Sequence, residues 1–529
     1  MMFSLFTFIL ITIAIAGYAS YRTKSINMKS QEGYFLGGRS LMALTIGSST
    51  LLANLSTEQL VGLSGQTYTG SMASMAWEVT TPIALIFMAF MFLPKYLRAG
   101  VTTVTEFLEK RYDQRTRQIV SLLMLLGFAS SFLPTVLYSG SLVLDQIFDI
   151  SSVLGTSQFF TVLIVSAAIG LVGMLYIVFG GLKAIASADS LYGVGLIAGG
   201  LLILILGLMA LGNGNVFNGV GTLTSEHTEK LNAIDGSNDA QVPWPTIFMG
   251  LLFNNLFYFC INQAIVQRPL AARNLKEGQK GVMITALFKL FGAFYLVLPG
   301  VIAYHLYGNS LANGDAAYPT LVTDLLPPVL TGVFAAILFG AVLSSFNGGI
   351  NSVITLFTLD LYKPLFHPDA DETTLVRSGQ RFAMIVAIVS IFISPFILFA
   401  PSGLYNYLQE MFGFFNIPVL AIMVVGFYTK RVSPFAAKVA VPVHIILYGA
   451  SKIFIGELNF LYVLSVLFPL SVIVMLVVGK FKPMAEPFEF KNEAPVDMVP
   501  WKYAKPAAAG LVAGIAILYV IFSPLGIAS

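Results

Sequence analysis

Ala53-Asn54-Leu55-Ser56-Thr57-Glu58-Gln59 lies inside an apolar run that extends from about residue 41 to 67. Five of these seven residues are polar, near the middle of a segment long enough to cross a bilayer as a helix. A continuous lipid-facing helix would not carry them, because hydrocarbon offers no partner to polar groups. The stretch therefore predicts a membrane helix that is unwound near mid-span and lines a cavity, as in transporters.

The rest of the chain has the composition of a polytopic membrane protein. Of its 529 residues, 57% are hydrophobic and 10% are charged, whereas soluble domains average about 25% charged residues. Soluble enzymes, fibrous proteins and disordered chains are therefore excluded, and long continuous apolar runs favour helices over a β-barrel. Fourteen segments are long enough to span a bilayer. They lie near residues 2–19, 41–67, 71–94, 119–146, 157–180, 187–212, 245–265, 281–305, 329–360, 380–400, 403–428, 435–453, 459–479 and 506–526.

The positive charges predict the orientation of these helices. Of the 29 lysines and arginines, all but Lys230, Lys289 and Lys452 fall near the loops that follow every second segment, beginning with the first. Loops enriched in this way are cytoplasmic, so both termini are expected on the outer side of the membrane. The first segment is expected to be a retained helix rather than a signal peptide, because its basic residues follow it.

We expect one transmembrane domain over residues 1–529. It would comprise an extra N-terminal helix and loop over 1–40, a core over 41–430 and accessory helices over 431–529. No obligate protein partner is evident; the lipid bilayer surrounds the chain. The single cysteine, Cys260, excludes a disulfide framework. The net charge of +3 gives no support to nucleic-acid binding, and the absence of a phosphate loop, a metal cluster or a nucleophile–base pair argues against an enzyme.

A second polar stretch, Phe253-Asn254-Asn255-Leu256-Phe257-Tyr258-Phe259, lies in the seventh segment and is followed by Asn262 and Gln263. The second and seventh segments are five apart, as expected if two inverted repeats of five helices form the core. We therefore expect an interruption of the seventh helix that matches the one in the second.

Further polar side chains at membrane depth extend the predicted cavity. Glu78, Lys289 and Gln409 each lie inside an apolar segment, where a polar or charged residue indicates a functional site by default. Carboxylate, amide and ammonium groups together suit a neutral polyhydroxylated ligand, because hydroxyls both donate and accept hydrogen bonds. They suit an acid less well, because no intramembrane arginine is available for a bidentate contact. The aromatic residues expected to stack on a sugar ring are Trp77, Tyr258 and Tyr405.

A cation site is predicted where the unwound second segment meets the ninth. Ser344 and Ser345 place two hydroxyls on the ninth segment, and the freed carbonyls of the unwound segment would complete a cage of oxygen atoms. Sodium, a hard cation, is expected to prefer such ligands. Asp189, at the start of the sixth helix, would add negative charge along an exit route.

Each feature also has a structural interpretation. Ser344 and Ser345 could serve only for close helix packing, and Glu78 and Lys289 could form an ion pair with no other role. Asp189 could cap its helix. The other residues that could serve only for packing or hydrogen bonding between helices are Asn54, Asn255, Trp77 and Tyr258.

Two further patterns predict structure rather than function. Gly193, Gly195 and Ala198 match a dinucleotide-binding pattern, but no strand precedes them, so helix packing through Gly195 and Gly199 is expected. The run Glu109-Lys110-Arg111 is expected to form a solvated cytoplasmic face.

At several of these positions the sequence resembles the sodium/solute symporter family, specifically the sodium–glucose cotransporter branch with its bacterial galactose transporters. The resemblance runs from about residue 30 to 480, and its motifs agree in order. They are Tyr34-Phe35-Leu36-Gly37-Gly38-Arg39-Ser40, Ala53-Asn54-Leu55-Ser56-Thr57-Glu58-Gln59, Glu106-Phe107-Leu108-Glu109-Lys110-Arg111-Tyr112, Gly180-Gly181-Leu182-Lys183-Ala184, Asn262-Gln263 and Val266-Gln267-Arg268.

The resemblance implies a LeuT-like core of two inverted five-helix repeats and sodium-coupled uptake by alternating access. It also implies roles for particular residues. The implied sugar-binding residues are Gln59, Glu78, Thr81 (in place of a serine), Asn255, Lys289 and Gln409. The implied gates are Tyr258, with Phe259 beside it where a tryptophan is common, and Leu63, Trp77 and Tyr405. The implied sodium ligands are the carbonyls of Leu52, Leu55 and Ala341 and the hydroxyls of Ser344 and Ser345. Relatives with a second sodium site carry hydroxyls where this chain has Asn347 and Gly348, which favours one sodium ion per substrate.

The sequence and the resemblance thus predict a sodium-coupled symporter for a hexose such as galactose or glucose, in a bacterial inner membrane with both termini periplasmic. The alternatives are the same machinery with another solute, namely an amino sugar, a sialic acid, a polyol or an amino acid, and a non-transporting sugar sensor or leak channel.

Overall fold

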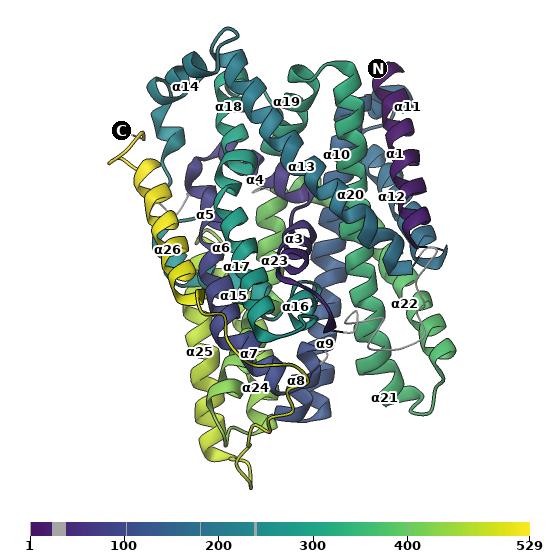
Figure 1. Cartoon of the computed structure of the whole chain (residues 1–529), viewed down its shortest axis with the longest axis vertical. Coiled ribbons are helices and arrows are strands. Elements are labelled where there is room, and N and C mark those ends of the chain that lie inside the picture. Colours follow the sequence, from purple (N-terminus) through teal and green to yellow (C-terminus); the bar gives the residue numbers. More distant parts are fainter. Residues whose placement is uncertain are drawn as a thin grey trace.

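The computed structural model describes residues 2–23, 39–101, 103–179, 181–236, 241–400 and 403–528. In these residues the chain is helical, with isolated β-bridges but no strand. The long helices run roughly parallel to one another in a single bundle (Figure 1). The predicted all-helical class is therefore confirmed. We call the end of the bundle near α8, α21 and α24 in Figure 1 its lower end, and the opposite end its upper end.

The helices follow one another along the chain as the apolar runs predict. In order they are α1 (Met2–Thr23), α3 (Ala43–Asn54), α4 (Thr57–Thr69), α5 (Ala76–Val79), α6 (Thr81–Phe87), α7 (Leu93–Arg98), α8 (Val104–Arg111), α9 (Gln114–Gly127), α10 (Leu133–Phe148), α11 (Ile150–Leu154), α12 (Gln158–Phe179), α13 (Gly181–Leu211), α14 (Val216–Ser225), α15 (Gly250–Cys260), α16 (Gln263–Leu270), α17 (Leu275–Leu290), α18 (Leu298–Tyr307), α19 (Ala317–Leu325), α20 (Pro328–Thr355), α21 (Lys363–Phe366), α22 (Glu372–Ile393), α23 (Gly403–Tyr428), α24 (Pro434–Phe454), α25 (Phe460–Phe481) and α26 (Ala504–Ile521).

The predicted count of fourteen spans is not confirmed. Among the described residues, ten helices are long and apolar enough to cross a membrane, or eleven if α17 and α18, bent by 41°, form one span. The other predicted segments contain shorter helices. The described apolar part of α1 is Phe3–Ile15, α15 is short, and the second segment is divided into α3 and α4. Length-based counting misses spans of this kind, because a break in the middle leaves two short pieces.

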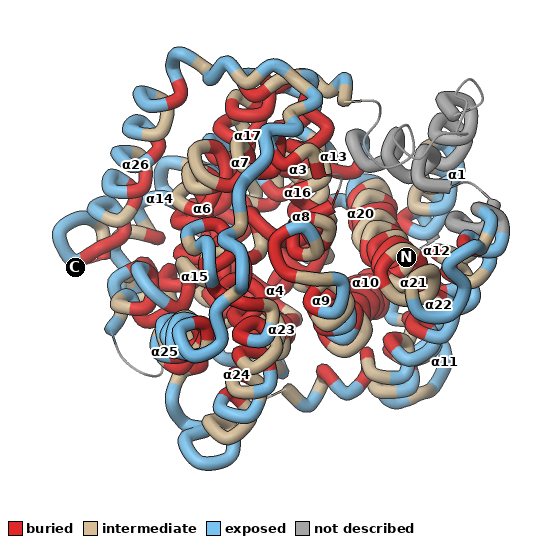
Figure 2. The backbone as a smooth tube through the Cα atoms, turned by 90° about the horizontal axis from the view of Figure 1, so that it is seen from below, coloured by how far each residue is buried: buried red, intermediate tan, exposed pale blue. Residues whose placement is uncertain are grey.

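Burial divides the bundle into a core and a lipid-facing rim. Seen from below in Figure 2, buried residues gather around α4, α10 and α16, whereas α11, α14 and α26 expose many of theirs. Large apolar side chains such as Leu171, Phe392 and Val466 are more than half exposed. Exposed apolar surface on this scale suits a lipid environment.

Glycines let α13 pack closely against α20. A Cβ atom on Gly195 would lie 2.7 Å from Ile337, and one on Gly199 would lie 2.0 Å from Phe334. Neither separation is possible for real side chains, so both positions require glycine. The predicted role of Gly195 and Gly199 in helix packing is therefore confirmed.

Candidate binding site

The helix predicted to unwind is broken where the polar stretch lies. α3 ends at Asn54, Leu55 and Ser56 are extended (ψ 111° and 173°), and α4 begins at Thr57. The last carbonyls of α3 therefore lack partners within the helix. The hydroxyl of Thr57 donates to the carbonyl of Leu338 in α20, 3.1 Å away and buried. The break thus lies against α20, one turn from Ala341.

A second break separates α15 from α16, at the end of the polar stretch that predicted it. Asn254 and Asn255 are helical residues of α15, and the interruption falls at Ile261 and Asn262. The side chain of Asn262 accepts a hydrogen bond from the amide of Ala264 and so begins the next helix. The two asparagines remain in the helix and direct polar side chains at the cavity described next.

A cavity lies between these broken helices and α5, α6, α17 and α23, and the space inside it that the centre of a water molecule can occupy is about 40 Å³. This volume is below the range of small-molecule sites, so the lining side chains would have to move apart to admit a sugar. It is lined by every residue predicted to bind sugar, namely Gln59, Glu78, Thr81, Asn255, Lys289 and Gln409, and by the predicted gate residues Trp77, Tyr258 and Tyr405. The remaining predicted gate residue, Leu63, is fully buried one turn above Gln59 in α4 but does not line the cavity.

One wall of the cavity is an ion pair. The ammonium of Lys289 lies 2.9 Å and 2.7 Å from the two carboxylate oxygens of Glu78, and both side chains are almost fully buried. Gly292 makes room for this contact, since a Cβ atom there would lie 2.9 Å from a Glu78 oxygen. Breaking such a pair leaves an uncompensated buried charge.

Amide side chains of α15 and α23 form a connected chain. Asn416 donates to Asn254, and Asn254 donates to Gln409, each over 2.7 Å. Asn255 donates to the hydroxyl of Thr80 over 3.2 Å. Sequence reasoning did not identify Asn254 and Asn416 as part of the site. The available signal was that Asn254 adjoins Asn255 and that Asn416 lies two helical turns after Gln409, on the same face.

Several buried polar atoms around the cavity have no partner among the described residues. They belong to the break and to the wall above it, and they include three acceptors and one donor. They are Asn54 Oδ1, Glu58 Oε2, Gln59 Oε1 and Trp77 Nε1. Unpaired buried polar atoms are costly, so a bound ligand that offers both donors and acceptors would stabilise this arrangement.

Below the cavity, the halves of the two broken helices meet. Asn54, at the end of α3, donates to the hydroxyl of Tyr258 in α15 over 3.1 Å. Tyr258 packs edge to face on Phe259, with ring centroids 4.9 Å apart. A movement of α3 away from α15 would therefore have to break the contact between Asn54 and Tyr258.

Above the cavity, aromatic and amide side chains close the bundle. Trp77 and Tyr405 pack edge to face at 5.5 Å, and Tyr405 contacts α4 so closely that Gly62 could carry no side chain. Next to them, Gln66 donates to Asn406, and Asn406 donates to Gln241, each over 2.7 Å. Part of the contact that closes the upper end is thus polar. Water can replace these hydrogen bonds when the upper end opens.

Asp315 lies beside this closure in η8 (Gly314–Ala316), between α18 and α19. Its carboxylate accepts hydrogen bonds from the amide of Leu404 (3.2 Å) and the hydroxyl of Tyr138 (3.4 Å). Burial raises the pKa of Asp315 from 3.8 to about 6, against the effect of these two hydrogen bonds. Closure of the upper end therefore favours the neutral carboxyl.

The raised pKa of Asp315 predicts that the stability of the folded protein depends on pH. The substitution Asp315→Asn is expected to remove this dependence. Because the pKa is higher in the folded form, the contribution of Asp315 is fully present below about pH 3.8 and is lost as the pH rises to about 6. We expect Asp315→Asn to melt near the parent at pH 4 and above it at pH 7, by the equivalent of roughly 1–3 kcal/mol. Parallel melting curves of both proteins across this range would contradict the assignment.

Of the residues predicted to hold sodium, Leu52 and Leu55 lie at the break in the second segment, and Ala341, Ser344 and Ser345 follow Leu338 along α20. Leu55 and Ala341 are buried, whereas Leu52, Ser344 and Ser345 are half-buried. Leu52 packs on α13, where a Cβ atom on Gly193 would overlap it. The side chain of Asp189, the predicted exit residue, lies outside the described residues.

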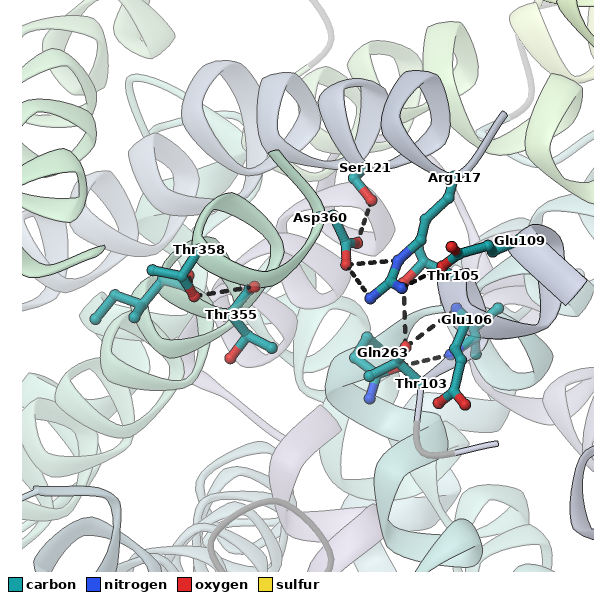
Figure 3. Close-up of polar contacts among 12 residues, drawn as sticks. Thr103, Thr105, Glu106, Glu109, Arg117, Ser121, Gln263, Thr355, Thr358 and Asp360 are labelled. Atoms are coloured by element: carbon teal, nitrogen blue, oxygen red, sulfur yellow. Dashed lines mark hydrogen bonds and ion pairs between the residues drawn. The ribbon is translucent and has the colours of Figure 1, made fainter. Parts of the chain in front are cut away.

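At the lower end, charged residues join three segments (Figure 3). Arg117 in α9 contacts Asp360 in η9 (Leu356–Tyr362) over 2.8 Å and also pairs with Glu109 in α8. Ser121 donates to the same aspartate. Beside this cluster, Gln263 at the start of α16 accepts from the amide of Val104. The second half of a broken helix is thereby tied to the link between α7 and α9.

The prediction that Glu109-Lys110-Arg111 forms a solvated face is wrong for Arg111. This arginine is fully buried, and its guanidinium donates to the carbonyls of Gly426, Thr429 and Val432 over 3.0–3.2 Å. It thus satisfies carbonyl groups at the end of α23 that have no partner within the helix. The sequence concealed this role, because the carbonyls lie more than 300 positions away.

Comparison with known proteins agrees with this architecture. The model of the sodium:solute symporter family matches residues 34–440. An uncharacterized symporter of Escherichia coli, YidK, is 44% identical over 521 residues, which cover 98% of this chain and 91% of that protein. The sodium/glucose cotransporter of Vibrio parahaemolyticus is 32% identical over 464 residues, which cover 83% of this chain and 82% of its own.

A solved structure shares the fold. A sodium-coupled sialic acid symporter in a substrate-bound outward-open state superposes with a TM-score of 0.76 over 92% of this chain and 98% of its own, at 19% identity. The family model spans more than half of the chain, including both broken helices and the cavity. The chain therefore belongs to the sodium:solute symporter family.

Proposed function

We propose that this sodium-coupled symporter imports a neutral hexose, such as galactose or glucose, across a bacterial inner membrane with both termini in the periplasm. The observation that carries the proposal is the cavity, whose buried polar atoms of opposite hydrogen-bonding character face one space between broken helices. Sugar hydroxyls both donate and accept, so one ring can satisfy atoms of both kinds. Trp77 and Tyr405 supply an aromatic cover of the kind that binds sugar rings.

The charges of the cavity favour a neutral solute over an acid. Two carboxyl groups, Glu58 and Glu78, face a single ammonium group, Lys289, which is already paired. An acidic solute would meet an excess of negative charge and no arginine. One relative is named as a sodium/glucose cotransporter and another as a sialic acid symporter. Of these two solutes, glucose fits the charges of this cavity better.

An amino sugar is the second candidate, and Glu58 is the specific observation in its favour. One of its carboxylate oxygens is buried without a partner among the described residues. An ammonium group on the sugar would pair with this carboxylate.

Sodium is proposed to bind where α3 ends against α20. The carbonyls of Leu52, Leu55 and Ala341 and the hydroxyls of Ser344 and Ser345 offer only oxygen, which suits a hard cation. The ion would hold α3 against α20 and favour the form that is open at its upper end. Solute then binds between the two inverted repeats. Because both ligands prefer the same conformations, each strengthens the binding of the other.

Release is proposed to begin at the contact between Asn54 and Tyr258. Loss of sodium would free α3 to separate from α15 and open a path toward the lower end, past Asp189. In this scheme Tyr258 is the inner gate, and Leu63, Trp77 and Tyr405 form the outer gate.

Uptake by the purified chain in proteoliposomes tests the proposal. Labelled galactose and glucose are expected to accumulate above the external concentration with an inward sodium gradient and not with an equal potassium gradient. Glucosamine, myo-inositol and N-acetylneuraminate form the competing panel. Equal uptake in both salts would contradict coupling, and sugar-gated current without accumulation would identify a sensor or channel instead.

A further inference from the structure

An open groove lies at the lower end, between the link that joins α23 to α24 and the end of α25. It is wide open to solvent and shares no residue with the solute cavity. Its walls combine basic and apolar side chains. They are Thr429, Lys430, Arg431, Val432, Leu476, Gly479, Lys480 and Pro487.

The positive charge of this groove is not neutralised from within the described chain. Lys430, Arg431 and Lys480 are exposed, and no ion pair joins any of them to a described carboxylate. Glu486 and Glu489 lie in the non-helical segment that follows α25 and borders the groove. Both are exposed, and neither forms an ion pair with these three cations. An anion entering the groove would therefore meet cations with free donors.

The backbone that carries two of these cations is fixed. The buried Arg111 binds the carbonyls of Thr429 and Val432 on either side of them. The carbonyls of Lys430 and Arg431 accept hydrogen bonds from the amides of Phe488 and Met484, over 2.8 Å and 2.9 Å. The basic groups are thus presented from an ordered link rather than from a loose loop, which lowers the entropy cost of binding.

Capping of α23 does not require these cations. Arg111 satisfies the carbonyl of Gly426, and Lys95 donates to that of Phe427 over 3.4 Å. The helix end is therefore complete without Lys430 and Arg431. The positive charges of Lys430 and Arg431 are therefore not needed to cap α23, and both side chains are exposed.

The groove lies at the level where lipid head groups meet hydrocarbon. α23 and α25 are both long and apolar enough to span a membrane, and the groove is at the end of each. Leu476 is 43% exposed within the groove, and Ile473, one turn further into the span on the same side of α25, is 54% exposed. Apolar surface thus continues from the basic residues into the lipid-facing side of α25.

We propose that this groove binds the head group of an anionic phospholipid. Lys430, Arg431 and Lys480 hold the phosphate, and the acyl chains lie along Leu476 and Ile473. A basic pocket between spanning helices next to an apolar face matches the two parts of such a lipid. Sidedness follows from the predicted cytoplasmic position of these basic loops. Lipid bound here would join the α23–α24 link to α25 and stabilise the accessory helices against the core.

Melting of the purified full chain in detergent tests the proposal. Added phosphatidylglycerol is expected to raise the melting temperature by several degrees, and neither phosphatidylcholine nor inorganic phosphate is expected to match it. The variant Lys430→Gln/Arg431→Gln/Lys480→Gln is expected to lose most of the gain. The control Lys276→Gln/Lys491→Gln/Lys502→Gln removes the same charge from exposed residues outside the groove and is expected to keep it.

Native mass spectrometry gives a second readout, in which the groove variant is expected to retain less phosphatidylglycerol than the control. Lys480→Gln alone, at a fully exposed helix end, serves if the triple variant folds poorly, and is expected to lose part of the gain. The proposal is overturned if groove and control variants respond alike, if phosphatidylcholine stabilises equally, or if inorganic phosphate reproduces the whole effect.

Discussion

Replacing Lys289 by methionine is expected to abolish solute binding and to lower the melting temperature. The variant leaves Glu78 as an unpaired carboxylate in a site where both side chains are almost fully buried. Removing one partner of a buried ion pair destabilises a protein by about 3–5 kcal/mol. Binding should weaken by more than 100-fold, because a donor that faces the cavity is lost and the remaining charge repels acceptors on the sugar.

A second variant separates the structural role of this pair from its role in binding. Glu78→Gln/Lys289→Met removes both charges and is expected to recover most of the lost stability, since no uncompensated ion remains. It should not recover binding, because both groups proposed to contact the solute are changed. Recovery of binding together with stability would show that the pair is purely structural.

Lys452→Met is the matched control. Lys452 lies 2.7 Å from Glu410, but both side chains are more than a quarter exposed and neither lines the cavity. Pairs with this degree of exposure contribute at most about 1 kcal/mol. The control is therefore expected to bind and transport solute as the parent does. Solute affinity by isothermal calorimetry and melting temperature are the two measurements for all three variants.

The fold and the polar lining of the cavity could be predicted from the sequence, because both are recognised by comparing a residue with its neighbours along the chain. An apolar run long enough to cross a bilayer defines a helix, and a polar group inside it has no partner in lipid. Gln59, Glu78 and Lys289 stand out in this way, and the structure brings them to one cavity. The family resemblance added their individual roles, which polarity alone does not supply.

Features that depend on distant contacts could not be predicted in the same way. The run around Arg111 has the composition of a surface loop, yet its guanidinium is buried because the end of α23 supplies carbonyls. Asn416 looks like an isolated polar residue until α15 brings Asn254 against it. The exact position of the second break, at Ile261 and Asn262 within the predicted polar stretch, depends on similar contacts. Asn254 and Asn255 satisfy their side chains with neighbouring helices, so the polar pair did not require unwinding.

The second large effect is expected at the proposed sodium site. Ser344→Ala/Ser345→Ala is expected to raise the sodium concentration that gives half-maximal uptake by at least tenfold, which corresponds to about 1.4 kcal/mol. The reason is the loss of two of the five proposed oxygen ligands, while alanine keeps the side chains small. If the serines served only for helix packing, alanine would preserve that packing, and the sodium dependence would remain as in the parent.

Ser352→Ala is the matched control for this variant. Ser352 lies in the same helix, two turns further on, and its hydroxyl donates to the carbonyl of Gly348 over 3.0 Å. Its removal changes one local hydrogen bond and no proposed ligand. Uptake by this variant should depend on sodium as in the parent. Equal effects of both variants would attribute the change to the helix rather than to an ion site.

Thermodynamic linkage between sodium binding and solute binding allows a more demanding test than a measured loss of uptake. If sodium strengthens solute binding by some factor, solute must strengthen sodium binding by the same factor. The serine variant should therefore lose the two effects together, measured as solute affinity with and without sodium and as sodium-dependent melting with and without solute. A variant that kept the effect of sodium on solute affinity would place the coupling ion elsewhere than between α3 and α20.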